Sequence, residues 1–279
     1  NRFFIFYWDI VHFEVMSAMK EFFSSSYMPF GLNSYFIALI PKKDNALNIK
    51  YFRLVAIGNT IPKVISKILT HRLGEITRGL ITYNQFGFVP VRIIQNYLFI
   101  ASECFNITRK KLNHGNMAMK IDISKSFDTI IWSFIFTILR MHGFSQGFVD
   151  LIGYMMRSFR LSIMVNGYPR GFFRCSRGFR QGDPLSGLLF SIANDYLSRF
   201  LNDLINISLY KRMSVGRNNF SPSHFCMRMT SYSSARLIEV PLLVLRVSSH
   251  ISKKFLDSSS VGVSTRLCLG MVLLFPDRT

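Results

Sequence analysis

Apolar residues recur every three to four positions along much of the chain, a spacing that predicts amphipathic helices. The clearest case is 60–80, where Ile65 and Leu69 share one face while Lys63 and Lys67 lie on the opposite one. The same spacing predicts a helix within 1–30 that ends near Phe22 and Phe23, and further helices over 96–108, 133–141 and 184–204.

Strands are predicted where apolar residues alternate or form short runs bounded by turn residues. Asn166-Gly167 supplies the positive φ angles of a tight turn, so the runs on either side of it, 161–165 and 172–175, should form a hairpin. Further strands are predicted at 35–39 and 117–123. Together the strands and helices predict an α+β fold.

The pattern changes after about residue 206. Serine becomes frequent, the helical and strand periodicities weaken, and the only acidic residues are Glu239, Asp257 and Asp277. We therefore expect a folded domain over 1–205 and a degenerate tail over 206–279.

The amino-acid composition and net charge indicate which kind of molecule the protein binds. Hydrophobic residues make up 49% of the 279 positions, which excludes a disordered chain. Lys and Arg number 34 against 15 Asp and Glu, a net charge of +19 that favours a nucleic acid partner, then an anionic membrane surface. A basic protein without such a partner is the remaining alternative. The cations are not gathered on one amphipathic helix and no apolar run reaches the length of a span, so no membrane association is expected.

The N-terminal sequence and the cysteine spacing indicate the compartment and the state of the thiols. The chain lacks an initiator Met and a clean signal peptide, so we expect an intracellular fragment, with nucleus and cytoplasm both open. The four cysteines are far apart, which indicates reduced thiols and neither a zinc site nor a disulfide framework.

One candidate for chemistry is the segment 120–128, Lys-Ile-Asp-Ile-Ser-Lys-Ser-Phe-Asp. A carboxylate at the end of an apolar strand is costly unless it binds a metal or a hydrogen-bond donor. Asp122 there could bind Mg²⁺. The alternative is that Asp122 or Asp128 caps the helix that follows.

A second candidate is the segment 176–186, which combines two glycines, two arginines and the start of a helix. Glycines let the backbone approach a ligand closely, while Arg177 and Arg180 could contact phosphates. The helix that Pro184 opens adds the positive end of its dipole. The alternative is a cationic loop followed by an ordinary helix.

Together these segments resemble the reverse transcriptase of non-LTR (LINE-type) retrotransposons, and the resemblance covers roughly 5–205. It implies fingers and a partial palm, with antiparallel strands packed on helices. It also implies RNA-directed DNA synthesis from dNTPs with Mg²⁺, on an RNA template and a DNA primer, without a protein partner. The matching segments are 38–42, 52–57, 63–73, 84–92, 122–128, 165–167 and 177–186.

The resemblance also implies roles for individual residues. Asp122 would be catalytic and bind Mg²⁺ through its carboxylate, with the Ile123 carbonyl as a second metal contact. Phe127 occupies the position of the ring that excludes a ribose 2′-OH, although a Phe buried in the core would give the same pattern. The nucleotide-binding residues would be Arg53, helped by Lys42 or Lys43, with Phe127, Gln181 and Gly182. The nucleic-acid-binding residues would be Lys63, Lys67, Arg72, Arg177 and Arg180.

The chain departs from the family where the second pair of palm carboxylates should lie. A Tyr-Ala-Asp-Asp motif is expected a few tens of residues after Ser186, yet the sequence contains no Asp-Asp pair. If the reading frame is shifted one nucleotide earlier, the codons that overlap those of 227–230 change. They then encode Tyr or His, followed by Ala, Asp and Asp, provided that Arg228 is encoded by CGG. We therefore expect out-of-frame sequence from about 226; the alternative is coincidence in a divergent tail.

The resulting expectation is a polymerase domain that is inactive as written. The alternative is a non-catalytic, basic nucleic-acid-binding remnant. Other departures agree with decay: Leu54 replaces a Pro, Pro62 lies near a helix start, Gly187 replaces a Pro, and Val91 replaces a Gly. Val91 would strain any turn that requires a positive φ there.

Overall fold

The computed structural model describes residues 2–108, 116–122, 126–180, 182–208, 224–226, 230–236 and 272–274. The chain divides into two compact units, each formed by two stretches of sequence. The first unit comprises Asn1–Leu73 and Ile135–Ser186, and the second comprises Gly74–Phe134 and Gly187–Thr279.

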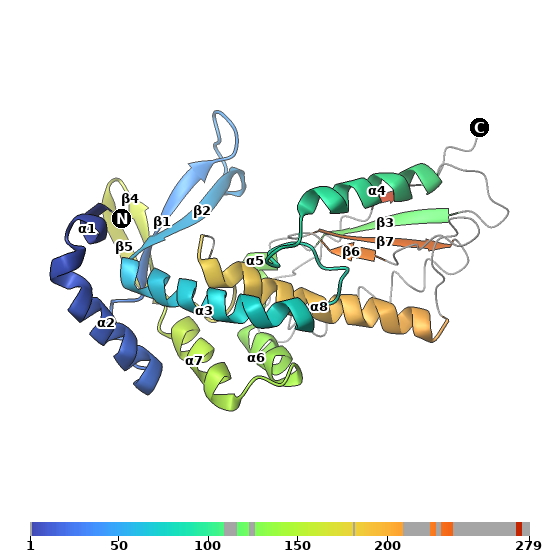
Figure 1. The fold of residues 1–279 in the computed structure, drawn as a ribbon. Coiled ribbons are helices and arrows are strands. Elements are labelled where there is room, and N and C mark those ends of the chain that lie inside the picture. Colours follow the sequence, from blue (N-terminus) through green and yellow to red (C-terminus); the bar gives the residue numbers. More distant parts are fainter. Residues whose placement is uncertain are drawn as a thin grey trace. The chain divides into compact units, whose positions relative to one another are not determined.

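The first unit contains a four-stranded sheet with the strand order β2-β1-β4-β5 (Figure 1). The pairs β1–β2 and β4–β5 are antiparallel, whereas β1 and β4 are parallel. The strands are β1 (Ser34–Pro41), β2 (Phe52–Gly58), β4 (Arg160–Val165) and β5 (Tyr168–Arg174), with a 3-10 turn, η1 (Ile49–Tyr51), before β2.

Helices accompany this sheet in the first unit, with a core of large apolar side chains. Phe22, Ile65, Leu69, Ile138 and Ile152 are at most 2% exposed. The helices are α1 (Arg2–Phe6), α2 (Trp8–Ser25), the first part of α3 (Thr60–Leu80), most of α6 (Trp132–Met141) and α7 (Gln146–Arg157).

The second unit contains the sheet β6-β7-β3-β8, in which each neighbouring pair is antiparallel. The strands are β3 (Asn116–Asp122), β6 (His224–Cys226), β7 (Thr230–Arg236) and β8 (Val272–Leu274). The helices are the end of α3, α4 (Ile94–Thr108), α5 (Ser126–Thr129) and most of α8 (Pro184–Asn206).

Helix α8 buries polar as well as apolar residues. Leu188, Leu197 and Leu201 are at most 2% exposed, as expected for the apolar face of an amphipathic helix. Five polar side chains of the same helix are also buried: Ser186, Ser191, Asn194, Asp195 and Ser198. Buried polar groups need hydrogen-bond partners, so these residues must bond to other parts of the chain.

The structure confirms the α+β class and the elements that the sequence pattern predicts. The Asn166-Gly167 turn has φ angles of 51° and 81°, as a tight hairpin requires. The sequence pattern did not predict α7, nor the strands β6, β7 and β8 beyond residue 206. Ile123, which was included in a predicted strand, lies outside the described residues.

Candidate functional site

The predicted catalytic residue Asp122 is the last residue of β3, directly opposite Thr230 at the start of β7. Strands β6 and β7 are antiparallel neighbours in which Cys226 pairs with Ser231, one position along from Thr230; residues 227–229 lie outside the described ranges. The predicted second metal contact, Ile123, lies outside the described residues.

The residue types at this end of the sheet do not fit a two-metal site. Mg²⁺ prefers carboxylate oxygens, and two-metal catalysis needs several of them. Asp122 is paired with a threonine, and the next pair along the ladder joins Ile121 to Ser231. Within the ranges that the structure describes, no three His, Cys, Asp or Glu residues gather in a way that could hold a metal ion.

Asp183, another carboxylate of the predicted motifs, caps the N-terminus of α8. Its Oδ2 accepts hydrogen bonds from the Ser186 backbone N–H at 3.2 Å and from the Ser186 hydroxyl at 3.1 Å. Ser66 of α3 donates to Asp183 Oδ1 at 2.6 Å and accepts from the Leu185 N–H at 3.2 Å. Asp183 therefore fixes the helix start and links it to α3, which is the ordinary work of an N-cap.

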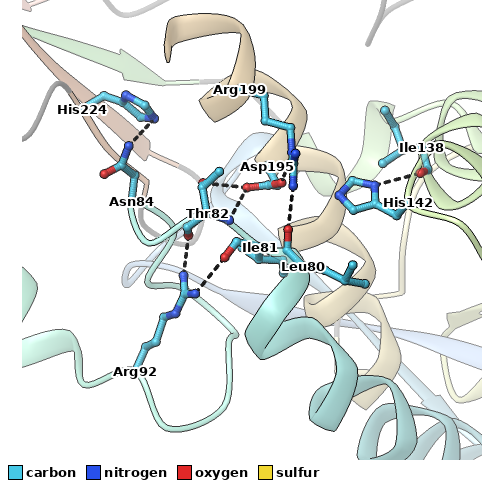
Figure 2. Close-up of polar contacts among 10 residues, drawn as sticks. All are labelled: Leu80, Ile81, Thr82, Asn84, Arg92, Ile138, His142, Asp195, Arg199 and His224. Atoms are coloured by element: carbon cyan, nitrogen blue, oxygen red, sulfur yellow. Dashed lines mark hydrogen bonds and ion pairs between the residues drawn. The ribbon is translucent and has the colours of Figure 1, made fainter. Parts of the chain in front are cut away.

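Asp195, in the middle of α8, is fully buried and is held by Thr82 and Arg199 (Figure 2). It accepts from the Thr82 backbone N–H at 2.8 Å and from the Thr82 hydroxyl at 2.6 Å. Arg199 Nε lies 2.7 Å from Asp195 Oδ2, and the same guanidinium donates to the Leu80 carbonyl at 2.7 Å. These bonds join α8 to the C-terminus of α3.

Arg92 binds the same helix end from the loop that follows it (Figure 2). Its guanidinium donates to the carbonyls of Ile81 at 2.9 Å and Thr82 at 2.6 Å, and also to the carbonyl of Gln85. Carbonyls at a helix C-terminus lack partners within the helix, and a cation there also interacts favourably with the dipole. Burial lowers the pKa of Arg92, and the Asp195 carboxylate opposes that shift.

The rest of this loop is also held by buried polar side chains. Asn194 donates to Gln85 Oε1 at 2.8 Å, and the Ser191 hydroxyl donates to the Gly87 carbonyl at 2.6 Å. Asn84 Nδ2 lies 3.2 Å from His224 Nε2 on β6. The residues of 84–92 therefore form internal contacts of the second unit.

Arg180, which the sequence predicted to contact a phosphate, is buried and bonded to other residues of the first unit. Its Nη1 donates to Asn33 Oδ1 at 3.0 Å and to the Tyr35 hydroxyl at 2.8 Å. Its guanidinium also lies over the rings of Tyr35 and Phe159, at 5.1 and 4.9 Å from their centroids. Burial raises the pKa of the Tyr35 phenol, and the positive charge of Arg180 opposes the rise. Arg180 thus fixes the loop before α8 in place.

Phe127 is 7% exposed and packs among other aromatic rings. Its ring stacks on Phe190 with centroids 4.9 Å apart, and Phe88 lies 6.1 Å away. Phe127 is thus buried among aromatic rings, and its role beside a ribose 2′-OH stays a prediction.

The remaining predicted binding residues lie on several elements of the first unit. Arg72 is exposed, with its guanidinium 5.2 Å from the centroid of the Phe23 ring. Gly182 has a φ of +98°, which favours glycine, and Gln181 beside it lies outside the described residues. Exposure varies among the other four: Lys67, Arg53 and Arg177 are exposed, and Lys63 is partly buried.

Sequence reasoning missed the structural roles of Asp195, Asn194 and Ser191. A signal was available: these three polar residues lie between apolar residues in the segment 188–197, and polar residues there are buried only with partners.

No helix in the part of the chain that the structure describes combines the length and apolar character needed to span a membrane.

Comparison with known proteins agrees with this fold. A sequence model of the family described as reverse transcriptase (RNA-dependent DNA polymerase) matches residues 40–211, more than half of the chain. The chain is 27% identical over 192 residues to the "Transposon TX1 uncharacterized 149 kDa protein" of Xenopus laevis, covering 69% of this chain and 15% of that protein. It is 28% identical over 174 residues to the "Retrovirus-related Pol polyprotein from type-2 retrotransposable element R2DM" of Drosophila melanogaster, covering 62% and 16%.

Solved structures of low sequence identity share the fold. Apo telomerase from Candida Tropicalis matches with a TM-score of 0.57 at 10% identity, covering 96% of this chain and 50% of that chain. The chain spans only about 15% of the length of the TX1 protein and half of the length of this telomerase.

Proposed function

The chain belongs to the reverse transcriptase (RNA-dependent DNA polymerase) family, of the non-LTR retrotransposon type, and from that premise we propose that it binds nucleic acid without polymerising. The folded part, 1–205, would be the remnant of fingers and palm, and 206–279 would be a degenerate tail. An RNA template and a DNA primer are the expected ligands, because the chain carries a net charge of +19 and matches this family.

One observation carries the proposal: the position opposite Asp122 is a threonine. Joining a dNTP to a primer requires carboxylates that hold two ions, one at the attacking 3′-OH and one at the leaving pyrophosphate. The sequence 227–231 is Met-Arg-Met-Thr-Ser and supplies no carboxylate. We therefore expect no catalysis by the chain as written.

A frameshift near Cys226 accounts for this loss. The four codons whose shifted reading can give Tyr-Ala-Asp-Asp are those of 227–230. The last of these residues, Thr230, is the first position of β7 and pairs with Asp122, whereas 227–229 lie outside the described residues. The register supports the hypothesis, because a carboxylate at Thr230 would lie opposite Asp122. Sequencing of the gene would test it: a codon other than CGG at Arg228 contradicts the hypothesis.

The experiment that tests the proposed function is primer extension on a primed RNA template with Mg²⁺ and dNTPs. We expect no incorporation by the chain as written. Correcting the reading frame near codon 226 would supply the two carboxylates together with the sequence after them, and incorporation should appear; the same corrected chain with both Asp replaced by Asn is the control of equal shape without charge. Adding Asp122→Asn to the restored chain should abolish incorporation. Incorporation by the unmodified chain would refute the proposal.

Binding is measured separately, by fluorescence anisotropy with labelled RNA over a salt series. The logarithm of the association constant decreases linearly with the logarithm of the salt concentration. For each phosphate contact that Lys63→Gln/Lys67→Gln removes, the magnitude of this slope should decrease by about 0.7 for single strands. Absence of binding at low salt would reject the nucleic-acid-binding part of the proposal.

A further inference from the structure

Helix α2 of the first unit (Figure 1) has two apolar sides, one buried and one exposed. The buried side packs into the core through Val15, Met19 and Phe22, which are at most 7% exposed. Residues two positions apart on a helix lie about 200° from each other around its axis. Phe13 therefore points away from the side that carries Val15, and it is 73% exposed. Ile10, one turn earlier on the same side as Phe13, is 69% exposed.

This exposed stripe is unusual for a helix at the surface of a folded domain, because the side opposite the core is ordinarily polar. Ile10 and Phe13 have the spacing of neighbouring a and d positions in a coiled-coil heptad. Phe6 of α1 comes four positions before Ile10 and is 79% exposed. The next positions at the same spacing, Ser17 and Lys20, are polar, so the stripe ends there. Contiguous exposed apolar side chains of this kind mark a surface that contacts another molecule.

Acidic residues border the stripe on both sides. Asp9 lies one turn before Phe13, and Glu14 lies one turn after Ile10, which are the g and e positions of the heptad. Both side chains are exposed, and neither forms an ion pair within the described ranges. We call these four residues the α2 outer face (Asp9, Ile10, Phe13 and Glu14).

The charge of α2 is opposite in sign to that of the chain. The chain has 34 basic and 15 acidic residues, whereas α2 has three acidic residues and one lysine. A locally acidic surface repels the phosphates of nucleic acids and of anionic lipids. It also disfavours a second copy of this chain, because two copies of α2 would bring acidic residues together at the e and g positions in either orientation. The molecule that covers this face should therefore be both apolar and basic.

We propose that the α2 outer face binds an amphipathic helix of a protein partner. The apolar residues of that helix would pack on Ile10 and Phe13, and its Lys or Arg residues would lie beside Asp9 and Glu14. Helices pair in this way because a and d side chains interdigitate while opposite charges at e and g select the partner. The family resemblance implied no protein partner, so this inference departs from that expectation. It is independent of RNA binding and of catalysis.

The test uses the full chain and two fluorescein-labelled synthetic peptides, each of about four heptads with Leu at a and d. One peptide carries Lys at every e and g position, and the other carries Glu there. By anisotropy we expect a micromolar Kd for the Lys peptide, because small interfaces are generally weak, and a Kd at least about tenfold higher for the Glu peptide. The chain as a whole is basic and attracts the Glu peptide, so a preference for the Lys peptide requires a locally acidic surface.

Two variants assign this binding to the α2 outer face. Ile10→Gln/Phe13→Gln removes the apolar contacts but keeps residues that favour a helix, so Kd for the Lys peptide should rise at least about tenfold. Asp9→Lys/Glu14→Lys should reverse the preference, so that the chain binds the Glu peptide more tightly. The unfolding midpoint in urea should be close to that of the parent in both, because all four side chains are exposed.

Matched controls make the same kinds of change elsewhere in the chain. Leu47→Gln/Tyr168→Gln removes two apolar side chains that are 98% and 68% exposed. Asp44→Lys/Asp203→Lys reverses two exposed charges. Each control should leave Kd for the Lys peptide within about twofold of the parent value, because none of these residues lies on α2.

The remaining outcomes decide against the inference or separate it from the proposed function. Failure of the parent chain to bind the Lys peptide at about 100 μM, or a preference for the Glu peptide, refutes it. A dimer of the parent chain in sedimentation, lost in Ile10→Gln/Phe13→Gln, would assign the face to a second copy and overturn it. Binding to vesicles of anionic lipid that the same variant loses would assign the face to a membrane and overturn it as well. If the chain binds the Lys peptide but no RNA, the proposed function fails and this inference stands.

Discussion

Replacement of Asp195 tests the internal contacts of the second unit most directly. Its carboxylate is 0% exposed and accepts from two groups of Thr82 as well as from Arg199. Asp195→Ala leaves the Thr82 N–H and hydroxyl without an acceptor, at a cost of about 1–3 kcal/mol for each buried donor. It also leaves the Arg199 cation unpaired, although that side chain is 51% exposed and can be solvated. We expect a total loss of about 3–5 kcal/mol.

Two further variants divide this loss between the helix contact and the ion pair. Asp195→Asn keeps an oxygen for Thr82 but faces Arg199 with an amide, so we expect a loss of about 1–2 kcal/mol. Arg199→Gln should cost about 1 kcal/mol, because the guanidinium is half-exposed and the two Thr82 donors still hold the buried carboxylate. The order Asp195→Ala, Asp195→Asn, Arg199→Gln therefore runs from the most to the least destabilising.

The assay is urea unfolding of the full chain followed by circular dichroism, with thermal unfolding as a second measure. For a domain of this size, about 1 kcal/mol shifts the melting temperature by about 2–4 °C, so Asp195→Ala should lower it by roughly 10 °C. If Arg199→Gln is as destabilising as Asp195→Ala, the ion pair dominates and the reasoning from Thr82 is refuted. A loss below about 1 kcal/mol for Asp195→Ala would refute it as well.

Val91 and Cys104 give two further predictions, one on stability and one on the reactivity of a thiol. Val91 is 76% exposed and has a φ of +73°, so Val91→Gly should raise the free energy of unfolding by about 1 kcal/mol in urea titrations; a loss of stability would contradict the strain argument. Burial raises the pKa of the Cys104 thiol to about 11, so alkylation by iodoacetamide should be slow at pH 8 and accelerate as the pH approaches that value. The chain unfolded in urea is the reference, and equal rates in the folded and unfolded chain at pH 8 would contradict the prediction.

The elements near the motifs could be predicted because their local signals are strong. The spacing of Ile65 and Leu69 predicted α3, and both residues are buried in its core face. The Asn166-Gly167 pair predicted the β4–β5 hairpin and adopts the positive φ angles expected of it. Strain was also predicted for Val91 if the turn there requires a positive φ, and its backbone does have a positive φ.

The surroundings of single residues could not be predicted from local signals. Arg180 was expected to face phosphates, but Asn33 and Tyr35, which hold it, precede it by more than 140 positions. A guanidinium can bind a phosphate or an amide oxygen equally well, so its residue type does not decide between the two. Only the fold brings Asn33, Tyr35 and Phe159 to Arg180.

One departure attributed to decay has a packing explanation. Gly187 stands where the family commonly has Pro, and a Cβ there would lie 2.6 Å from Cδ1 of Phe88. The Phe88 ring thus occupies the space that a side chain at 187 would need. The two residues fit each other, so Gly187 gives no support to the idea of a decaying sequence.

Most of the motif residues make contacts that stabilise the fold, which explains how a chain could keep these motifs and lose the one that supplies carboxylates. Asp183, Asp195 and Arg92 hold helix ends, so losing any of them would destabilise the fold. Carboxylates gathered for metal binding have the opposite effect, because like charges repel one another when no ion is present. A chain that must only fold would therefore retain the first group and gain stability by losing the second. For this reason the motif residues around α8 are evidence of folding, and the proposed loss of catalysis rests on the residues paired with Asp122.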